Sequence, residues 1–268
     1  MTKAQAQESQ VGTLDDLILV STPSPAVRQL TLNRPAKRNA LSQALITELL
    51  GQLRLASSDG TVGAVIVTGS GGFFSAGADI KEISVLDSED ARRVRYLEDL
   101  CDGVRKFRKP LIAAVEGKAL GGGFELALMA DFIVASTSAQ FGLPEVGIGL
   151  IPGAGGTQRL TAAVGKYRAM RTILLNEPIS GSEAFNLGLV CSVTDPGKAI
   201  DSALEIAAKL ASRSPAAVML AKEAICKADE VAQDEGFERS LYYTAFGTKD
   251  KKEGVAAFLE KREPTWTR

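Results

Sequence analysis

Two carboxylates lie in sequence surroundings that favour chemistry. Glu125 follows three glycines and enters an apolar segment, and Glu145 lies in FGLPEVGIGLIPG, with no basic residue within ten positions on either side. A carboxylate withdrawn from water has a raised pKa, which suits general acid–base catalysis near pH 7. The alternative is structural, with Glu125 as a first-turn glutamate of a helix and Glu145 as a loop carboxylate that accepts backbone N–H bonds.

Three glycine-rich loops accompany these carboxylates, at 69–79, 117–125 and 147–157. None has the Gly-Lys-Ser/Thr of a P-loop or a G-x-G-x-x-G that opens a helix, which argues against nucleotide hydrolysis and Rossmann-type NAD binding. Glycine also lets backbone N–H groups approach a ligand closely. Donors from 75–79 and 121–123 aimed at one point would form an oxyanion hole, each worth about 3–4 kcal/mol of transition-state stabilisation. The alternative is that the glycines only make tight turns and close helix packing.

The composition excludes several kinds of site. The chain has no histidine among its 268 residues, so neither a Ser-His-Asp triad nor a histidine zinc site can form. A net charge of −1 argues against nucleic acid as a partner. The three cysteines, Cys101, Cys191 and Cys226, fit neither a disulfide framework nor a zinc cluster, and we expect buried thiols in a reducing compartment.

Targeting signals in the sequence are weak. Residues 1–13 lack the apolar core of a secretory signal, and no apolar run reaches the ~18–20 residues of a membrane span. We therefore expect a soluble intracellular protein without a membrane partner, in the cytoplasm, with the mitochondrial matrix as the alternative.

The elements that must position these groups follow from hydrophobic periodicity. A hairpin is expected at 17–20 and 27–32, and Ser42 caps a helix whose apolar residues recur at helical spacing. A strand, a glycine loop and a helix then occur twice, with strands at 64–68 and 111–115 and helices at 87–106 and 124–129; a further strand is expected at 132–135. This order predicts an α/β fold of layered ββα turns.

The last part of the chain has a different character. Strand signals stop near residue 196, and helices are expected at 199–211, 216–228, 235–248 and 254–261. We therefore divide the chain into a flexible N-terminal extension (1–16), a core (17–199) and a C-terminal helical region (200–268).

The sequence closely resembles the enoyl-CoA hydratase (crotonase) family from about residue 17 to the end. The matching motifs, in the family's order, are LNRPAKRNAL (32–41), FFSAGADIKE (73–82), KPLIAAVEGKALGGGFELAL (109–128), FGLPEVGIGLIPGAGGTQRL (141–160) and EGVAAFLEKR (253–262). The resemblance implies a crotonase-like ββα spiral core and a C-terminal helical region that builds a homotrimer, commonly paired into a homohexamer. It also implies an acyl-CoA thioester as substrate, with no cofactor and no metal.

The resemblance also assigns roles to residues. Glu125 would activate water for attack at C3, Glu145 would supply a proton to C2, and the backbone N–H groups of Ala78 and Gly122 would form the oxyanion hole. The substrate and CoA site implied by the motifs consists of Lys37, Ala40, Ala76, Ala78, Asp79, Ile80, Lys81 and Gly122, joined by Phe258 and Lys261, which would reach the CoA of a neighbouring subunit.

The presence of both glutamates favours hydration of trans-2-enoyl-CoA to 3-hydroxyacyl-CoA, as in fatty acid β-oxidation. The alternatives are an enoyl-CoA isomerase, another crotonase-type lyase such as a dicarboxylic or methylglutaconyl enoyl-CoA hydratase, and a non-catalytic or RNA-binding relative. The acyl pocket is expected between 84–96 and the helix that starts near Gly165.

Overall fold

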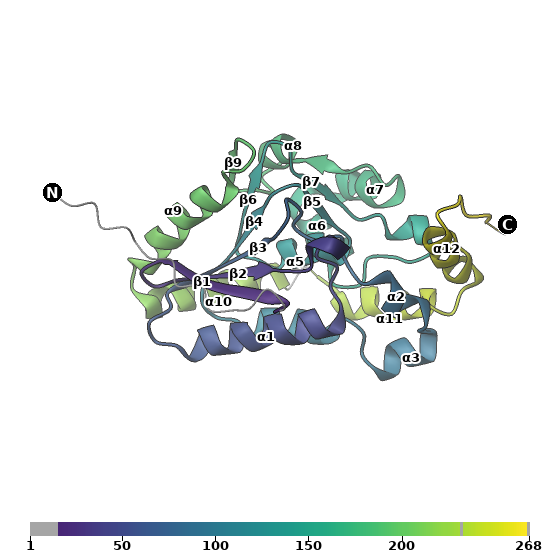
Figure 1. Cartoon of the computed structure of the whole chain (residues 1–268), viewed down its shortest axis with the longest axis horizontal. Helices are drawn as coiled ribbons and strands as arrows, with labels where there is room; N and C mark the ends of the chain where they lie inside the picture. Colours follow the sequence, from purple (N-terminus) through teal and green to yellow (C-terminus); the bar gives the residue numbers. More distant parts are fainter. Residues whose placement is uncertain (1–15, 231–232, 267–268) are drawn as a thin grey trace.

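The computed structural model describes residues 16–230 and 233–266, so the expected N-terminal extension lies, apart from Asp16, outside the described residues. A six-stranded sheet of order β1-β2-β3-β4-β6-β9 forms the centre of the molecule (Figure 1). β1 and β2 pair antiparallel, as the expected hairpin requires, and the other neighbours pair parallel. Its strands are β1 (Ile18–Ser24), β2 (Val27–Leu32), β3 (Ala64–Gly69), β4 (Leu111–Val115), β6 (Phe132–Ser136) and β9 (Ser192–Thr194).

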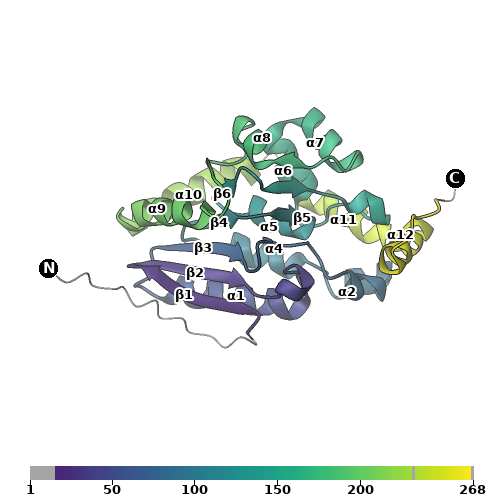
Figure 2. The same ribbon diagram turned by 45° about the horizontal axis from the view of Figure 1, so that its top comes forward.

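Both faces of the central strands are buried, which explains their continuous apolar sequences. Along β3, Val65 and Val67 face the main core, to which α1 (Gln43–Ser58) contributes its apolar side. Ala64 and Ile66 face the opposite side, where α9 (Ala199–Ala211) covers the sheet with small alanines. The two helices therefore cover opposite faces (Figure 2), and the first helix of the expected C-terminal region packs on the core.

A second, three-stranded sheet was not anticipated from the sequence. It consists of β5 (Lys118–Leu120), β7 (Gln140–Gly142) and β8 (Ile179–Ser180), with β5 and β7 parallel. Strands of two or three residues next to glycines carry too few side chains to show an alternating pattern. Isolated bridges join Ser75 to Ala119 and Leu41 to Ala78, so the 69–79 loop runs alongside β5.

Most helices follow the predicted pattern, but the last helix runs over 249–260 rather than 254–261, the helix before it ends at 245 rather than 248, and the segment 87–106 is divided. Ser42 caps α1 by accepting the N–H of Leu45 at 3.4 Å, as expected. The single helix predicted for 87–106 is wrong, because left-handed backbone at Arg95 and Leu97 separates two helices and turns Tyr96 and Leu97 into the core. The helices of this part are η1 (Pro35–Lys37), α2 (Ile80–Ser84), α3 (Ser88–Arg93), α4 (Glu98–Arg105), α5 (Gly122–Leu128), η2 (Glu145–Ile148), α6 (Gly156–Val164), α7 (Lys166–Leu174) and α8 (Gly181–Asn186).

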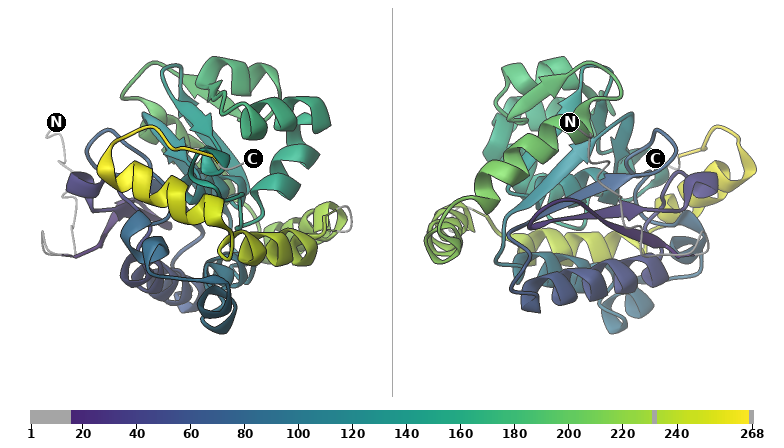
Figure 3. Two further views of the ribbon diagram at one scale, coloured as in Figure 1. Left: turned by 90° about the vertical axis from the view of Figure 1, so that its right-hand side faces the viewer. Right: turned by 60° about the vertical axis from the view of Figure 1, so that its left-hand side comes forward.

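Three further helices complete the chain, namely α10 (Pro215–Glu230), α11 (Glu235–Ala245) and α12 (Lys249–Glu260). α12 packs against α2 and η2 at the end of the molecule away from α9 (Figure 1). α10 lies at the edge of the molecule (Figure 3, right). Within 16–230 and 233–266, no helix is long and apolar enough to cross a bilayer.

Candidate active site

The pairing of β5 with β7 brings the two glutamates to one edge of the small sheet. Leu120 is opposite Gly142, and the N–H of Gly121 donates to the Gly142 carbonyl at 2.9 Å. Because the carboxyl ends of parallel strands meet at the same edge, the residues that follow both strands emerge together. The carboxylate of Glu145 lies against the turn that leads to Glu125, since a Cβ placed on Gly121 would be 3.2 Å from its Oε1.

Glu125 is almost completely buried on α5, with 1% of its surface exposed. Its Oε1 accepts the N–H groups of Ala154 at 2.7 Å and of Gly156 at 2.9 Å, while Oε2 accepts no hydrogen bond from the described residues. Burial, followed by the negative charge of Glu238, raises the pKa of Glu125 to about 7, although the two N–H groups act in the opposite direction. The group therefore changes its charge across the neutral range.

Glu145 begins η2 and differs from Glu125 in its surroundings. Its Oε2 is buried and has no hydrogen-bond partner within the described residues. Burial and then the charge of Glu125 raise the pKa of Glu145 well above the ordinary carboxyl value. The backbone N–H of Glu145 itself acts in the opposite direction, so the alternative of a loop carboxylate bound to backbone N–H groups applies in part, but not to Oε2.

Two backbone N–H groups lie side by side next to the glutamates. Leu41 donates to the Gly77 carbonyl at 2.8 Å and accepts from Asp79 at 3.3 Å, so the N–H of the intervening Ala78 points away from Leu41. Gly122 is the first residue of α5, where N–H groups have no partner within the helix. A Cβ on Gly122 would lie 3.4 Å from the nitrogen of Ala78. Neither N–H has a backbone acceptor in the described part of the chain, so the pair can bind one developing oxyanion.

The other predicted CoA-site residues cluster around this pair. Asp79 caps α2 by accepting the N–H of Lys81 at 3.1 Å, and Arg34 pairs with its carboxylate at 3.1 Å. Arg34 also donates to the Ala40 carbonyl at 2.6 Å, which joins 37–40 to 76–81. Ile80 begins α2, Ala76 donates its N–H to Arg38, and Lys37 and Lys81 are exposed.

Phe258 and Lys261 lie at the end of α12, and both are exposed. The helix itself is fixed to its own chain by Lys251, whose Nζ donates to the carbonyls of Ile83 at 2.8 Å and Leu86 at 2.6 Å. α12 is thus attached to the segment that follows the predicted CoA-binding residues. A contact of Phe258 and Lys261 with a neighbouring subunit's CoA stays a prediction.

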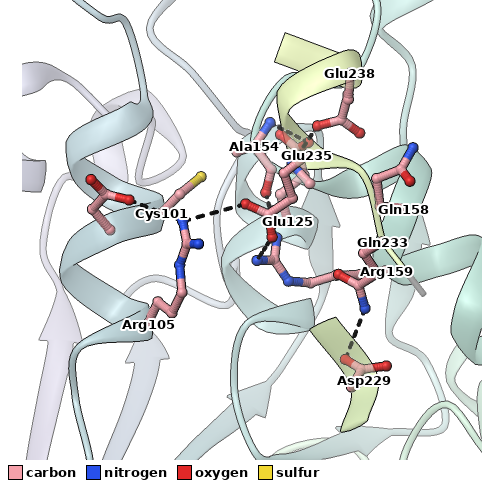
Figure 4. Close-up of polar contacts among 12 residues, drawn as sticks. Cys101, Arg105, Glu125, Ala154, Gln158, Arg159, Asp229, Gln233, Glu235 and Glu238 are labelled. Carbon is pink, nitrogen blue, oxygen red and sulfur yellow. Dashed lines mark hydrogen bonds and ion pairs between the residues drawn. The ribbon is translucent and has the colours of Figure 1, made fainter. Parts of the chain in front are cut away.

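Three residues of the site were missed by sequence reasoning. Asn39, fully buried, donates to the carbonyls of Ser70 at 2.9 Å and Phe73 at 2.7 Å and joins two loops. Arg34 holds Asp79, as described above. Glu238 on α11 is 2% exposed and lies with Glu125 and Ala154 in one polar cluster (Figure 4). Its only sequence signal is the spacing of four residues to the buried Tyr242, which places both on one helix face.

The cysteine prediction is only partly correct. Cys101 is buried, but Cys191 is exposed and Cys226 is half-buried. Cys191 immediately precedes β9 at the end of the sheet, where the core does not cover it. No group of three His, Cys, Asp or Glu side chains that could hold a metal ion occurs in the residues the structure describes.

Comparison with known proteins gives consistent results. The family profile described as Enoyl-CoA hydratase/isomerase matches residues 23–268. A probable enoyl-CoA hydratase of Rhizobium meliloti is 48% identical over 92% of this chain and 96% of its own length. A 2,3-dehydroadipyl-CoA hydratase of Escherichia coli is 43% identical over 92% and 97%.

Solved structures give the same result for the fold. An enoyl-CoA hydratase/isomerase from Pseudoalteromonas atlantica superposes with a TM-score of 0.84 at 30% identity, over 94% of this chain and all of that one. An enoyl-CoA hydratase from Geobacillus kaustophilus gives 0.77 at 40% identity, over 94% and 98%. The similarity extends across nearly the whole chain in both comparisons.

Proposed function

Because this chain belongs to the enoyl-CoA hydratase/isomerase (crotonase) family and hydrates enoyl-CoA thioesters, we propose that Glu125 and Glu145 are its catalytic acid–base pair. The observation that carries the proposal is the position of both carboxylates beside the paired N–H groups of Ala78 and Gly122. An oxyanion site flanked by the buried Glu125 and by Glu145, whose Oε2 is buried, suits addition of water to a double bond conjugated with a thioester.

The reaction then proceeds as follows. The thioester oxygen lies between the N–H groups of Ala78 and Gly122. Oε2 of Glu125, which accepts no hydrogen bond from the described residues, takes a proton from water as the water oxygen bonds to C3. The π electrons of the double bond move onto the thioester oxygen, where the two donors stabilise the enolate. Glu145 gives its proton to C2, the carbonyl reforms, and exchange with solvent restores both glutamates.

The electrostatics agree with these roles. Activity requires ionised Glu125 and protonated Glu145. The pKa of Glu125 is raised to about 7, so the rate rises with pH as this group loses its proton. The pKa of Glu145 is raised well above the ordinary value, so the rate falls at higher pH as the acid is lost. Because the carboxylates interact, the two apparent pKa values of this bell-shaped profile belong to the pair.

The first experiment follows the loss of enoyl-thioester ultraviolet absorbance with crotonyl-CoA. We expect Glu145→Gln to lower kcat by at least about 100-fold and to abolish the alkaline limb of the profile, because the proton donor is lost. Glu125→Gln is expected to lower kcat similarly. A matched control is Glu48→Gln, since Glu48 accepts the backbone N–H of Ile18 at 3.0 Å on a different side of the core. Undiminished turnover by Glu145→Gln contradicts the proposal.

Product analysis separates hydration from isomerisation on the same scaffold. A 3-hydroxyacyl-CoA product is expected, whereas a shifted double bond without added oxygen would indicate the isomerase alternative. The E. coli relative's name also makes a dicarboxylic substrate a second candidate. Comparison of kcat/KM for crotonyl-CoA and 2,3-dehydroadipyl-CoA distinguishes the two acyl classes.

We also propose that the chain assembles as a homotrimer, alone or paired into a hexamer, through its C-terminal helices. The support is the exposed apolar side of α10. The cytoplasmic location and the absence of a cofactor or nucleic-acid partner stay predictions from the sequence.

A further inference from the structure

Four successive N–H groups of one turn are shared between two carboxylates from distant parts of the chain. Ala154 and Gly156 donate to Oε1 of Glu125, and Gly155 and Thr157 donate to Glu238 at 2.6 Å and 2.7 Å. The turn leads into α6, whose first N–H groups have no partner within the helix. The donors to Glu125 and to Glu238 alternate along this turn. A rearrangement of the turn that removes the donors of one glutamate therefore also displaces the donors of the other.

The environment of Glu238 differs from that of Glu125 in one respect. Both of its carboxylate oxygens accept hydrogen bonds, Oε1 from Gly155 and Oε2 from the N–H and the hydroxyl of Thr157. Glu125, in contrast, accepts through Oε1 alone. Both oxygens of Glu238 are therefore occupied by protein donors. Glu125 keeps Oε2 for a hydrogen bond with water.

Glu238 is itself held rigidly. Asp234 caps α11 by accepting the N–H of Phe237 at 2.9 Å. Arg239, the next residue, donates to the Tyr96 carbonyl at 3.0 Å and to the Cys101 sulfur at 3.1 Å. These contacts attach α11 to α4 and to the residue two positions before it, and thereby hold the carboxylate of Glu238 against the 154–157 turn.

We propose that Glu238 is a positioning residue of the hydration reaction, which holds the 154–157 turn so that Ala154 and Gly156 bind Oε1 of Glu125 and leave Oε2 for the water. This inference rests on the proposed role of Glu125 as the base. A base confined to one oxygen and one orientation meets its substrate without reorganisation, and misplacement by about 1 Å costs about 100-fold in rate.

Glu238 also acts on Glu125 through its charge. After burial, the negative charge of Glu238 is the largest influence that raises the pKa of Glu125. Burial also raises the pKa of Glu238 itself. Loss of this charge should therefore lower the pKa of Glu125. The other titratable or charged groups around Glu125 are Glu145 on η2, Cys101 on α4, Arg159 on α6, and Arg239 and Tyr242 on α11.

The test is the pH profile of Glu238→Gln with crotonyl-CoA. The amide removes the charge and places an NH₂ group against N–H donors, so we expect kcat to fall by about 10-fold to 100-fold with KM within about twofold of wild type. The acid limb, which reports ionisation of Glu125, should move to lower pH. A fall in kcat or stability with an unmoved acid limb overturns the proposal, as does a wild-type profile.

A second variant tests the proposal even if Glu238→Gln does not fold. Thr157→Val removes the hydroxyl that donates to Glu238 and accepts from Gln158, and it keeps the backbone N–H bonds to Glu238. This hydroxyl favours the ionised form of Glu238. Its loss should move the acid limb in the same direction by a smaller amount, and an unmoved limb contradicts the proposal.

Controls separate this inference from the catalytic assignment. Glu48→Gln should keep the wild-type profile. If Glu125→Gln retains full turnover, the proposed base is wrong. If Glu125→Gln is inactive while Glu238→Gln and Thr157→Val behave as wild type, only the positioning role fails.

Discussion

At the scale of single residues, the site depends on how few donors each carboxylate receives. Glu125 and Glu238 take two N–H groups each from one turn, whereas Oε2 of Glu145 has no hydrogen-bond partner within the described residues. Hydrogen bonds to an ionised carboxylate lower its pKa, and burial raises it. Burial and the neighbouring carboxylates raise the pKa of Glu125 to about 7 and that of Glu145 well above the ordinary value, and for Glu125 the N–H groups of Ala154 and Gly156 act in the opposite direction.

The glycine at the donor pair permits a test at this scale. Gly122 has ordinary helical backbone, and a Cβ there would make only van der Waals contacts, at 3.4 Å with the Ala78 nitrogen and 3.5 Å with Leu41. We expect Gly122→Ala to fold with equal or slightly higher thermal stability. Its methyl group would obstruct the oxyanion position, so kcat should fall by about 100-fold.

The matched control is Gly51→Ala in the middle of α1, where the nearest atom to a new Cβ is an arginine nitrogen at 3.8 Å. This variant should gain about 0.5–1 kcal/mol in stability and keep its activity. Differential scanning calorimetry and steady-state kinetics measure both quantities. Wild-type kcat in Gly122→Ala would show that the space beside Ala78 is not used by the thioester oxygen.

At the scale of elements, short strands and one helix set the geometry. β5 and β7 contain three residues each, yet their parallel register places Glu125 and Glu145 at the same edge of the small sheet. α12 connects the two halves of the site, because it packs on η2, which starts at Glu145, and on α2, which follows Ala78. Gly254 makes this close packing possible, since a Cβ there would be 2.6 Å from the Ile148 carbonyl oxygen.

The buried ammonium of α12 provides the second test. Lys251 donates to the carbonyls of Ile83 and Leu86 and lies 5.2 Å from the centre of the Phe246 ring. We expect Lys251→Met to lower the free energy of unfolding by about 1–3 kcal/mol, because the buried carbonyl of Ile83 and the partly buried carbonyl of Leu86 lose their donor. KM for crotonyl-CoA should rise more than kcat falls, since α2 bears the predicted CoA contacts.

Lys252→Met is the control, because Lys252 is the exposed neighbour of Lys251 on the same helix. Chemical denaturation and steady-state kinetics give the two readouts. An unchanged KM in a destabilised Lys251→Met would mean that α12 supports the fold without orienting the CoA segment.

At the scale of the whole molecule, one helix is incompletely packed on its own chain. α10 is attached mainly by polar contacts, with Lys222 donating to the Lys109 carbonyl at 2.9 Å and pairing with Asp131 at 2.8 Å. Ile225 and Leu220 on this helix are exposed, and a cavity of about 580 Å³ lies between the helix and the core. An apolar helix side without a partner in its own chain favours association with another copy.

The assembly prediction can be tested with matched substitutions. Leu220 and Leu55 are exposed to nearly the same extent, 63% and 60%, on α10 and α1 respectively. We expect Leu220→Glu to dissociate the wild-type assembly, measured by light scattering as three copies of the 28.2 kDa chain or a multiple, whereas Leu55→Glu should not. A monomeric wild type, or an intact assembly in Leu220→Glu, contradicts an interface on α10.

The sequence by itself determined the α/β class, the hairpin and the strands around 64–68 and 111–115, and it indicated Glu125 and Glu145 as the candidate acid–base pair. These features depend on local patterns: apolar runs between turns, a serine cap, and carboxylates in stretches without basic neighbours. Only the tertiary structure decided the register of β5 on β7, the break at Arg95 to Leu97 and the presence of Glu238 beside Glu125. Each of these arises from contacts between residues far apart in the chain, which no local pattern specifies.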